Sequence, residues 1–92
     1  MNFLRVRRVH FVGIGGVGMS GLAEILASVG LTVTGSDLRE GEETRRLRDL
    51  GIPVFAAGHR AEHVAGADVV VYSSAVAEEN PELVAARIAG VP

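Results

Sequence analysis

The chain has 92 residues, enough for one small domain with a single hydrophobic core but short for a complete enzyme with two substrate sites. Apolar residues make up 48% of the sequence and the formal net charge is −2, so the composition is that of a globular domain without a basic surplus for nucleic acid. Cysteine and lysine are both absent, which excludes disulfides, thiolate metal sites and the lysine-dependent P-loop that binds nucleoside triphosphates.

The first half of the chain alternates between predicted strands and helices. Val9–Val12 is a short, almost wholly apolar strand, as expected where helices cover both faces of a sheet. The β-branched run Thr32–Gly35 predicts a second strand. A helix is predicted between these strands, after a glycine-rich turn, and it ends at Gly30. Its apolar side chains recur at the spacing of one helical face; they are Leu22, Ile25, Leu26 and Val29.

A short helix and two further strands are predicted next. Pro53–Phe55 is typical of an edge strand because it carries a proline. A helical turn over residues 61–64 precedes Val69–Tyr72, the most apolar strand, which we expect to be central. The short helix that precedes these strands ends at Gly51. Its inner face is indicated by Thr44, Leu47 and Leu50. We interpret its outer face as a solvated surface formed by Arg45, Arg46 and Arg48.

The last predicted element is a helix that begins at Asn80 and ends at Ala89, before Gly90. Asn80 is a good N-cap, the following proline fits the first helical position, and Glu82 is an acid in the first turn. Residues 91–92 would begin a fifth strand. Repeated strand–helix–strand order predicts an α/β fold, a Rossmann-like three-layer sandwich with a parallel sheet in the strand order 3-2-1-4 and a fifth strand beyond.

A glycine motif lies where such a fold binds phosphates. Gly13–Gly18 matches G-x-G-x-x-G between the first strand and the first helix. Gly13 would permit a tight turn, Gly15 would let an anion approach the backbone, and Gly18 would let the helix pack close to the strand. The unpaired amides and the dipole of the helix then favour a diphosphate. The alternative is a tight turn that binds no ligand.

Polar residues follow two of the predicted strands. A carboxylate at Asp37 can accept hydrogen bonds from both hydroxyls of a ribose, although aspartate also favours turns for its own reasons. Ser73 and Ser74 follow the fourth strand, which neighbours the first in the predicted order. Their hydroxyls either face the glycine loop across the crevice where the chain order reverses, or cap the next turn.

The histidines do not show the spacing of metal ligands, and we expect no metal in this domain. His10 lies within the first strand and is expected to be a packed, hydrogen-bonded core residue. His59 follows Gly58 at the carboxyl end of the sheet, where it could reach a nucleotide or be an ordinary surface residue. His63 is expected to face solvent.

Six segments of the sequence form a recognisable pattern: His10–Gly21, Gly35–Leu38, Gly58–His59, Gly66–Val71, Ser73–Ala75 and Asn80–Glu82. Taken together, they resemble the Mur ligases that add the first L-alanine to UDP-N-acetylmuramate. The resemblance covers essentially the whole chain in the right order and is far more specific than the glycine motif. The paralogous ligases that recycle murein tripeptide carry a different glycine loop and lack the Ser-Ser-Ala segment.

The resemblance implies that residues 1–92 are the N-terminal, UDP-N-acetylmuramate-binding domain of a three-domain enzyme of peptidoglycan biosynthesis. In the family's reaction ATP phosphorylates the lactyl carboxylate of the sugar, and the amine of L-alanine attacks the acyl phosphate. We therefore expect this domain to be inactive alone and to hold no cofactor, with ATP and Mg²⁺ bound by the central domain and a C-terminal domain completing the enzyme. The resemblance assigns the diphosphate to Gly13, Gly15, Gly16, Val17 and Gly18, and the uridine and phosphates to Asp37, His59, Ser73 and Ser74.

Two other classes of protein share the loop and the acidic residue: the NAD-binding module of a dehydrogenase and the nucleotide-sensing regulatory domain of a potassium channel. Neither requires Met19–Gly21 or Ser73–Ala75. No apolar run approaches the ~20 residues that cross a bilayer, and the N-terminus does not fit a signal peptide. We expect a cytoplasmic protein that binds neither membrane nor nucleic acid.

Overall fold

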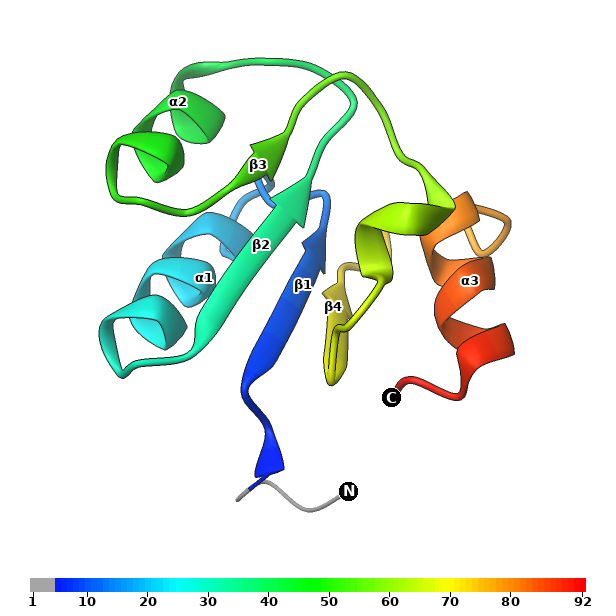
Figure 1. Ribbon diagram of the computed structural model, residues 1–92. Helices are drawn as coiled ribbons and strands as arrows, with labels where there is room; N and C mark the ends of the chain where they lie inside the picture. The colour runs from blue at the N-terminus through cyan, green and yellow to red at the C-terminus, as the bar shows by residue number, and fades with distance from the viewer. Residues whose placement is uncertain (1–4) are drawn as a thin grey trace.

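The computed structural model describes residues 5–92, and its centre is a parallel sheet. The strands lie in the order β3-β2-β1-β4, which confirms the predicted 3-2-1-4 arrangement (Figure 1). Their carboxyl ends therefore all lie along one edge, where ligands bind in open α/β sheets. The strands are β1 (Arg8–Val12), β2 (Thr32–Ser36), β3 (Val54–Phe55) and β4 (Val69–Tyr72).

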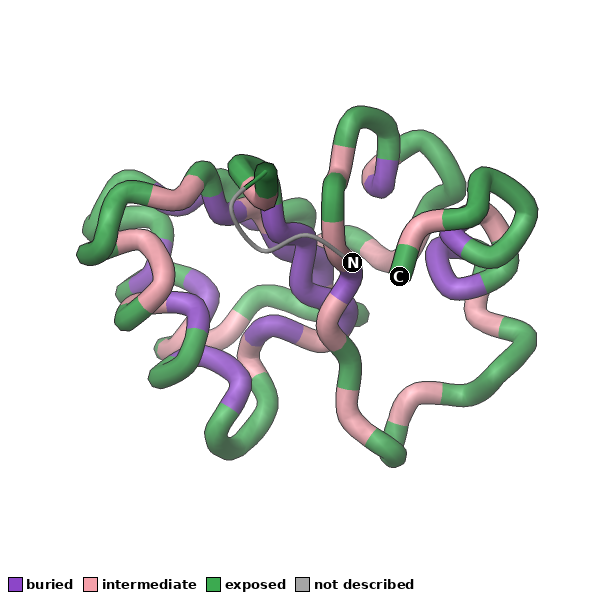
Figure 2. The backbone as a smooth tube through the Cα atoms, turned by 90° about the horizontal axis from the view of Figure 1, so that it is seen from below, coloured by how far each residue is buried: buried purple, intermediate pink, exposed green. Residues whose placement is uncertain are grey.

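Helices cover both faces of the sheet, which gives the predicted three layers. On one face, Phe11 packs in a core with Ala23 of α1 (Met19–Ser28) and Leu47 of α2 (Glu42–Asp49). On the other face, the core combines Val12 and Val70 of the sheet with the short 3-10 helix η2 (Ala61–Val64) and α3 (Pro81–Ala89). Figure 2 shows buried positions on both sides of the sheet, with exposed loops around them. Neighbouring side chains of β1 point to opposite faces, so His10 faces α3 and η2.

The predicted inner face of α1 was largely wrong. The apolar side chains Leu22, Ile25 and Val29 face outward from α1, with Val29 70% exposed, because the buried face is formed instead by Met19, Ser20 and Ala23. Of the predicted stripe, only Leu26 packs against the core, where it is partly buried. The small side chain of Ala23 allows the closer approach to the sheet.

We expected β4 to be central because it is the most apolar strand, and this prediction was also wrong. It lies at the end of the four-stranded order, and only Val70 in it is buried, whereas β1 is buried at every position after Arg8. The amide of Val70 donates a hydrogen bond of 2.9 Å to the carbonyl oxygen of Pro92, so the chain after α3 returns alongside β4 as a fifth strand would. Leu50, predicted on the inner face of α2, is 53% exposed at its C-cap.

Helix α3 begins as predicted. The side chain of Asn80 accepts a hydrogen bond from the amide of Glu82 at 2.9 Å, and Gly90 ends the helix in the left-handed conformation. This cap fixes the first turn of α3 against the sheet, and thereby places Glu82 beneath the carboxyl ends of the strands. None of the helices between residues 5 and 92 has the length and apolar character needed to cross a membrane.

Candidate functional site

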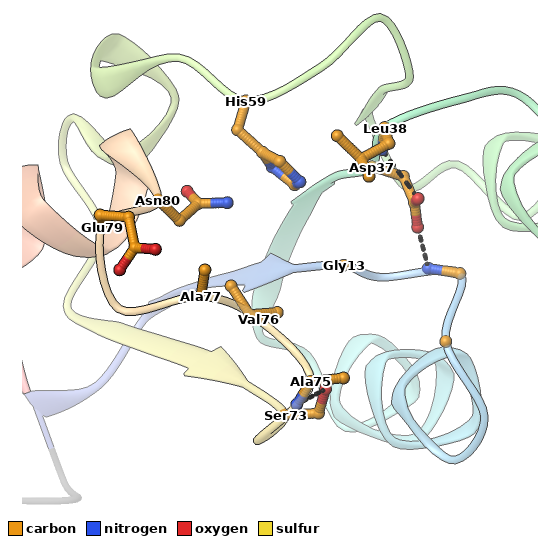
Figure 3. Close-up of a pocket in the computed structure, with 12 residues that line it drawn as sticks. Gly13, Asp37, Leu38, His59, Ser73, Ala75, Val76, Ala77, Glu79 and Asn80 are labelled. Atoms are coloured by element: carbon orange, nitrogen blue, oxygen red, sulfur yellow. Dashed lines mark hydrogen bonds between the residues drawn. The ribbon is translucent and has the colours of Figure 1, made fainter.

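A cavity of about 600 Å³ opens at the carboxyl edge of the sheet, between the loops that follow β1, β2, β3 and β4 (Figure 3). Its volume is within the usual range for small-molecule sites. It is lined by Gly13, Gly15, Gly16, Asp37, Leu38, His59, Ser73, Ala75, Val76, Ala77, Glu79 and Asn80. The structure thus brings six of the predicted site residues to one cavity, whereas Val17, Gly18 and Ser74 do not line it.

The glycine loop forms the start of α1 and is held mainly by its own backbone. The amides of Met19 and Ser20 donate to the carbonyl oxygen of Gly16, and that of Gly16 donates to Gly13. Within the described chain, the amides of Val17 and Gly18 donate to no backbone carbonyl oxygen. Helix α1 has no acidic residue in its first turn, so its dipole is not compensated there. The loop can therefore accept an anion.

The reason predicted for Gly18 was wrong. A Cβ at this position would meet no atom within 4 Å, so close helix packing does not demand a glycine. The demand is conformational, because Gly18 has a φ of +81° as the N-cap of α1, in the left-handed region that glycine adopts without strain.

Asp37 is bound to the glycine loop itself. Its carboxylate accepts the amide of Gly15 at 2.8 Å and the amide of Leu38 at 2.8 Å (Figure 3). A Cβ on Gly15 would lie 2.9 Å from the nearer carboxylate oxygen, which explains the glycine at this position. A carboxylate can accept about four hydrogen bonds, so Asp37 retains capacity for two ligand hydroxyls while it supports the loop. It acts both as a turn residue and as a cavity residue.

The two serines after β4 differ in position. Ser73 lines the cavity, and its hydroxyl oxygen also accepts the amide of Ala75 at 3.3 Å, so it caps the next turn at the edge of the cavity. Ser74 is exposed and lies outside the cavity lining. We expected the two serines to be equivalent, but the chain turns directly after Ser73, where the amide of Val76 donates to the carbonyl oxygen of Ser73 at 3.0 Å, and Ser74 lies in that turn.

The three histidines gather around one buried carboxylate, Glu82. His10 is 1% exposed and its Nε2 lies 2.6 Å from Glu82 Oε1, which confirms the expected hydrogen-bonded core residue. The prediction that His63 faces solvent was wrong: its side chain is 9% exposed, stacks on Phe55 and lies 2.8 Å from Glu82 Oε2. His59 is equally buried and lines the cavity, so it is not an ordinary surface residue.

Glu82 is ionised in this setting. Burial alone would raise the pKa of its carboxyl group, but hydrogen bonds from His10, His63 and Ser36 outweigh that effect and lower the pKa to about 2. The sequence indicated only an acid in the first turn of a helix. The signal that was missed is His10, since a polar side chain in an otherwise apolar strand requires a buried partner.

The cluster resembles a serine–histidine–acid triad in composition but not in geometry. Ser36 Oγ and Glu82 both contact the same ring nitrogen of His59, at 2.8 and 3.2 Å, whereas a triad uses the two nitrogens separately. Ser36 is also fully buried and cannot reach a substrate. Despite the three histidines, no group of residues in the described range is arranged to hold a metal ion.

Comparison with known proteins agrees with this architecture. A family model described as "Mur ligase family, catalytic domain" matches residues 8–92. The chain is 66% identical over 88 residues to a UDP-N-acetylmuramate–L-alanine ligase of Sorangium cellulosum, covering 96% of this chain and 19% of that protein. A ligase of the same name from Bordetella avium is 58% identical over 88 residues, with the same coverage. The chain therefore spans about a fifth of the length of these curated relatives.

Solved structures give the same fold. The UDP-N-acetylmuramate-alanine ligase MurC of Thermotoga maritima matches 92% of this chain and 20% of its own, with a TM-score of 0.88 and 47% identity. The UDP-N-acetylmuramate:L-alanyl-gamma-D-glutamyl-meso-diaminopimelate ligase of Neisseria meningitides matches 95% of this chain and 28% of its own, with a TM-score of 0.83 and 31% identity. Identity is thus higher to the proteins named for L-alanine than to the ligase named for a tripeptide.

Proposed function

The chain belongs to the Mur ligase family, and from that premise we propose that it binds UDP-N-acetylmuramate as the substrate domain of a longer ligase that joins L-alanine to this nucleotide sugar. The observation that carries the proposal is the meeting of the glycine loop, Asp37 and His59 at one cavity. Proteins of this name that are 58 and 66% identical to the chain support it further. The alternative of an NAD-binding module gains no support from these relatives.

The diphosphate is assigned to the loop Gly13–Gly18. No arginine or lysine lines the cavity within the described residues, so the anion would depend on main-chain amides and the dipole of α1. The amides of Val17 and Gly18, which donate to no backbone carbonyl oxygen in the described structure, are the donors best suited to phosphate oxygens. Val17 and Gly18 can therefore belong to the binding site although they do not line the cavity.

The uridine is assigned to the part of the cavity formed by Asp37 and His59. The carboxylate of Asp37 is held by the amides of Gly15 and Leu38, which fixes its position before a ribose arrives. This arrangement reduces the entropy lost on binding. Ser73 lies across the cavity, where its hydroxyl can reach the phosphates, and Ser74 is assigned only a peripheral contact.

Catalysis is assigned to other parts of the ligase. The family model is described with the words "catalytic domain", but the chain has no lysine and so no P-loop to bind ATP. The residues at the cavity do not fit ATP and Mg²⁺, which we assign to a central domain, with a C-terminal domain completing the enzyme. The isolated chain is expected to bind substrate without turnover, and the whole enzyme is expected in the cytoplasm.

An NMR titration of the ¹⁵N-labelled chain tests the proposal. UDP-N-acetylmuramate and UDP should both shift the amide signals of Gly13–Gly18 and Asp37, and NAD at the same concentration should not. Asp37→Ala should weaken the response to both uridine ligands, whereas the matched change Asp49→Ala, on the exposed end of α2, should not. Saturation by NAD, or uridine-induced shifts confined to another face, would overturn the proposal.

A further inference from the structure

Glu82 receives more hydrogen bonds than a helix start requires. Its side chain is fully buried, and its two oxygens accept from Ser36, from the amide of Arg60 and from three imidazole rings. The bond to His10 is the shortest of the three at 2.6 Å, that to His63 is 2.8 Å, and that to His59 is 3.2 Å. Of these partners, His59 lines the ligand cavity.

The direction of the hydrogen bonds around Ser36 is fixed. Its hydroxyl has one proton, which it donates to Glu82 Oε1 at 2.7 Å because an ionised carboxylate can only accept. The oxygen of Ser36 is then an acceptor toward Nδ1 of His59, 2.8 Å away. Nδ1 of His59 must therefore carry the proton, and its second contact, to Glu82, requires the same.

The other ring nitrogen of His59 faces the cavity. Every buried side-chain nitrogen and oxygen in the described structure has a hydrogen-bond partner, and Nε2 of His59 has none among these residues. This nitrogen is therefore accessible, and Figure 3 shows the ring directed into the space between Leu38 and Asn80. In the neutral ring only one nitrogen carries a proton, so a proton on Nδ1 leaves Nε2 with a free lone pair.

We propose that Glu82 is a positioning residue that, through Ser36, holds His59 with a protonated Nδ1 and presents its Nε2 to the cavity as a hydrogen-bond acceptor. This inference rests on the proposed function, because the ligand is taken to be a uridine nucleotide. An unprotonated Nε2 repels phosphate oxygens and attracts a donor. The relay therefore assigns His59 to a donor on the uridine, either a ribose hydroxyl or the N3–H of uracil, and away from the diphosphate.

The test measures the tautomer of His59 directly. Two-bond ¹H–¹⁵N NMR on the ligand-free chain, at a pH where the ring is neutral, distinguishes a protonated Nδ1 from a protonated Nε2. The wild type should show the proton on Nδ1. Ser36→Ala and Glu82→Gln should both shift the population toward the Nε2-protonated tautomer. Thr34→Val, which removes the other partner of His10 but leaves the relay intact, should not.

The same variants are then titrated with UDP, CDP and 2′-deoxy-UDP. Ser36→Ala should weaken UDP roughly two- to tenfold, the range expected for one hydrogen bond. If a variant loses only its preference for UDP over CDP, the donor to His59 is the N3–H of uracil. If it loses only its preference for UDP over 2′-deoxy-UDP, the donor is the ribose hydroxyl. Restoring the hydroxyl with Ser36→Thr should recover both the tautomer and the affinity.

A proton on Nε2 in the wild type overturns the inference, and so does a tautomer that is unchanged in both Ser36→Ala and Glu82→Gln. If Glu82→Gln does not fold, the wild-type reading remains decisive, because a proton on Nε2 overturns the inference by itself. Because the tautomer is read without ligand, a chain that shows the predicted tautomer but does not bind UDP would contradict the proposed function and leave the relay standing.

Discussion

Replacing Glu82 with glutamine should destabilise the chain in a pH-dependent way. The substitution keeps the size of the side chain and removes its charge, which five donors now face. The pKa of Glu82 falls from 4.5 to about 2 in the folded chain. At about 1.4 kcal/mol for each tenfold change in proton affinity, the ionised carboxylate contributes about 3 kcal/mol to folding. Breaking one side of a buried ionic pair costs a similar amount.

The sign of the pH dependence follows from the lowered pKa of Glu82. Because the carboxyl pKa is lower in the folded chain, the unfolded chain binds more protons between pH 2 and 4.5. The contribution of Glu82 is therefore complete above about pH 5 and is lost as the pH falls through this window. The comparison is therefore made from pH 5 downward, across the window in which Glu82 changes its protonation.

Urea unfolding of both forms at several pH values measures this contribution. The difference in the free energy of unfolding between wild type and Glu82→Gln should be about 3 kcal/mol at pH 5 and should shrink steadily toward pH 3. Glu78→Gln, at an exposed position before α3, should show no such trend. A difference that stays constant from pH 5 to pH 3 would refute the assignment of an ionised, stabilising Glu82.

Three further substitutions test the binding site and the start of helix α3, which supports it. Gly15→Ala places a Cβ 2.9 Å from the carboxylate of Asp37, so calorimetry should find about tenfold weaker UDP binding, the cost of one charged hydrogen bond; an unchanged affinity would mean that this contact is unimportant. Asp37→Ala should weaken UDP by roughly 1–3 kcal/mol in the same assay, and an equal affinity would remove this residue from the site. Asn80→Ala deletes the cap of α3 and should lower the free energy of unfolding by roughly 0.5–2 kcal/mol in urea, with Asn80→Asp near wild type; no change would show that the cap is dispensable.

The order of elements could be predicted from the sequence because each signal was local. The helix start at Asn80, the glycine loop and the β-branched run of β2 each depend on residues close together in the chain. Parallel strands joined by helices then leave few topologies, and the observed β3-β2-β1-β4 order is one of them. Local patterns were therefore sufficient for the architecture.

Burial was predicted less well because it depends on contacts between distant residues. Leu22 and Ile25 have the spacing of an inner face, yet the small Ala23 faces the sheet and they do not. The apolar strand β4 was expected at the centre, although hydrophobicity alone does not decide position in a sheet. The identity of the inner face depends on what packs against it, and the sequence does not show this.

The buried polar cluster could not be assembled from the sequence at all. His10, His59 and Glu82 are separated by 23 to 72 residues and meet only through the fold. Each has an ordinary local interpretation: a core histidine, a loop histidine and an acid near a helix start. Ser36 likewise ends a strand and gives no hint that it bridges His59 and Glu82.

The most direct test of the account is a structure of the chain with UDP-N-acetylmuramate. We predict that the two phosphates lie against the backbone amides between Gly13 and Gly18, with the uridine between Asp37 and His59. Phosphates bound on a different face of the sheet, or a uridine pointing away from both side chains, would contradict it.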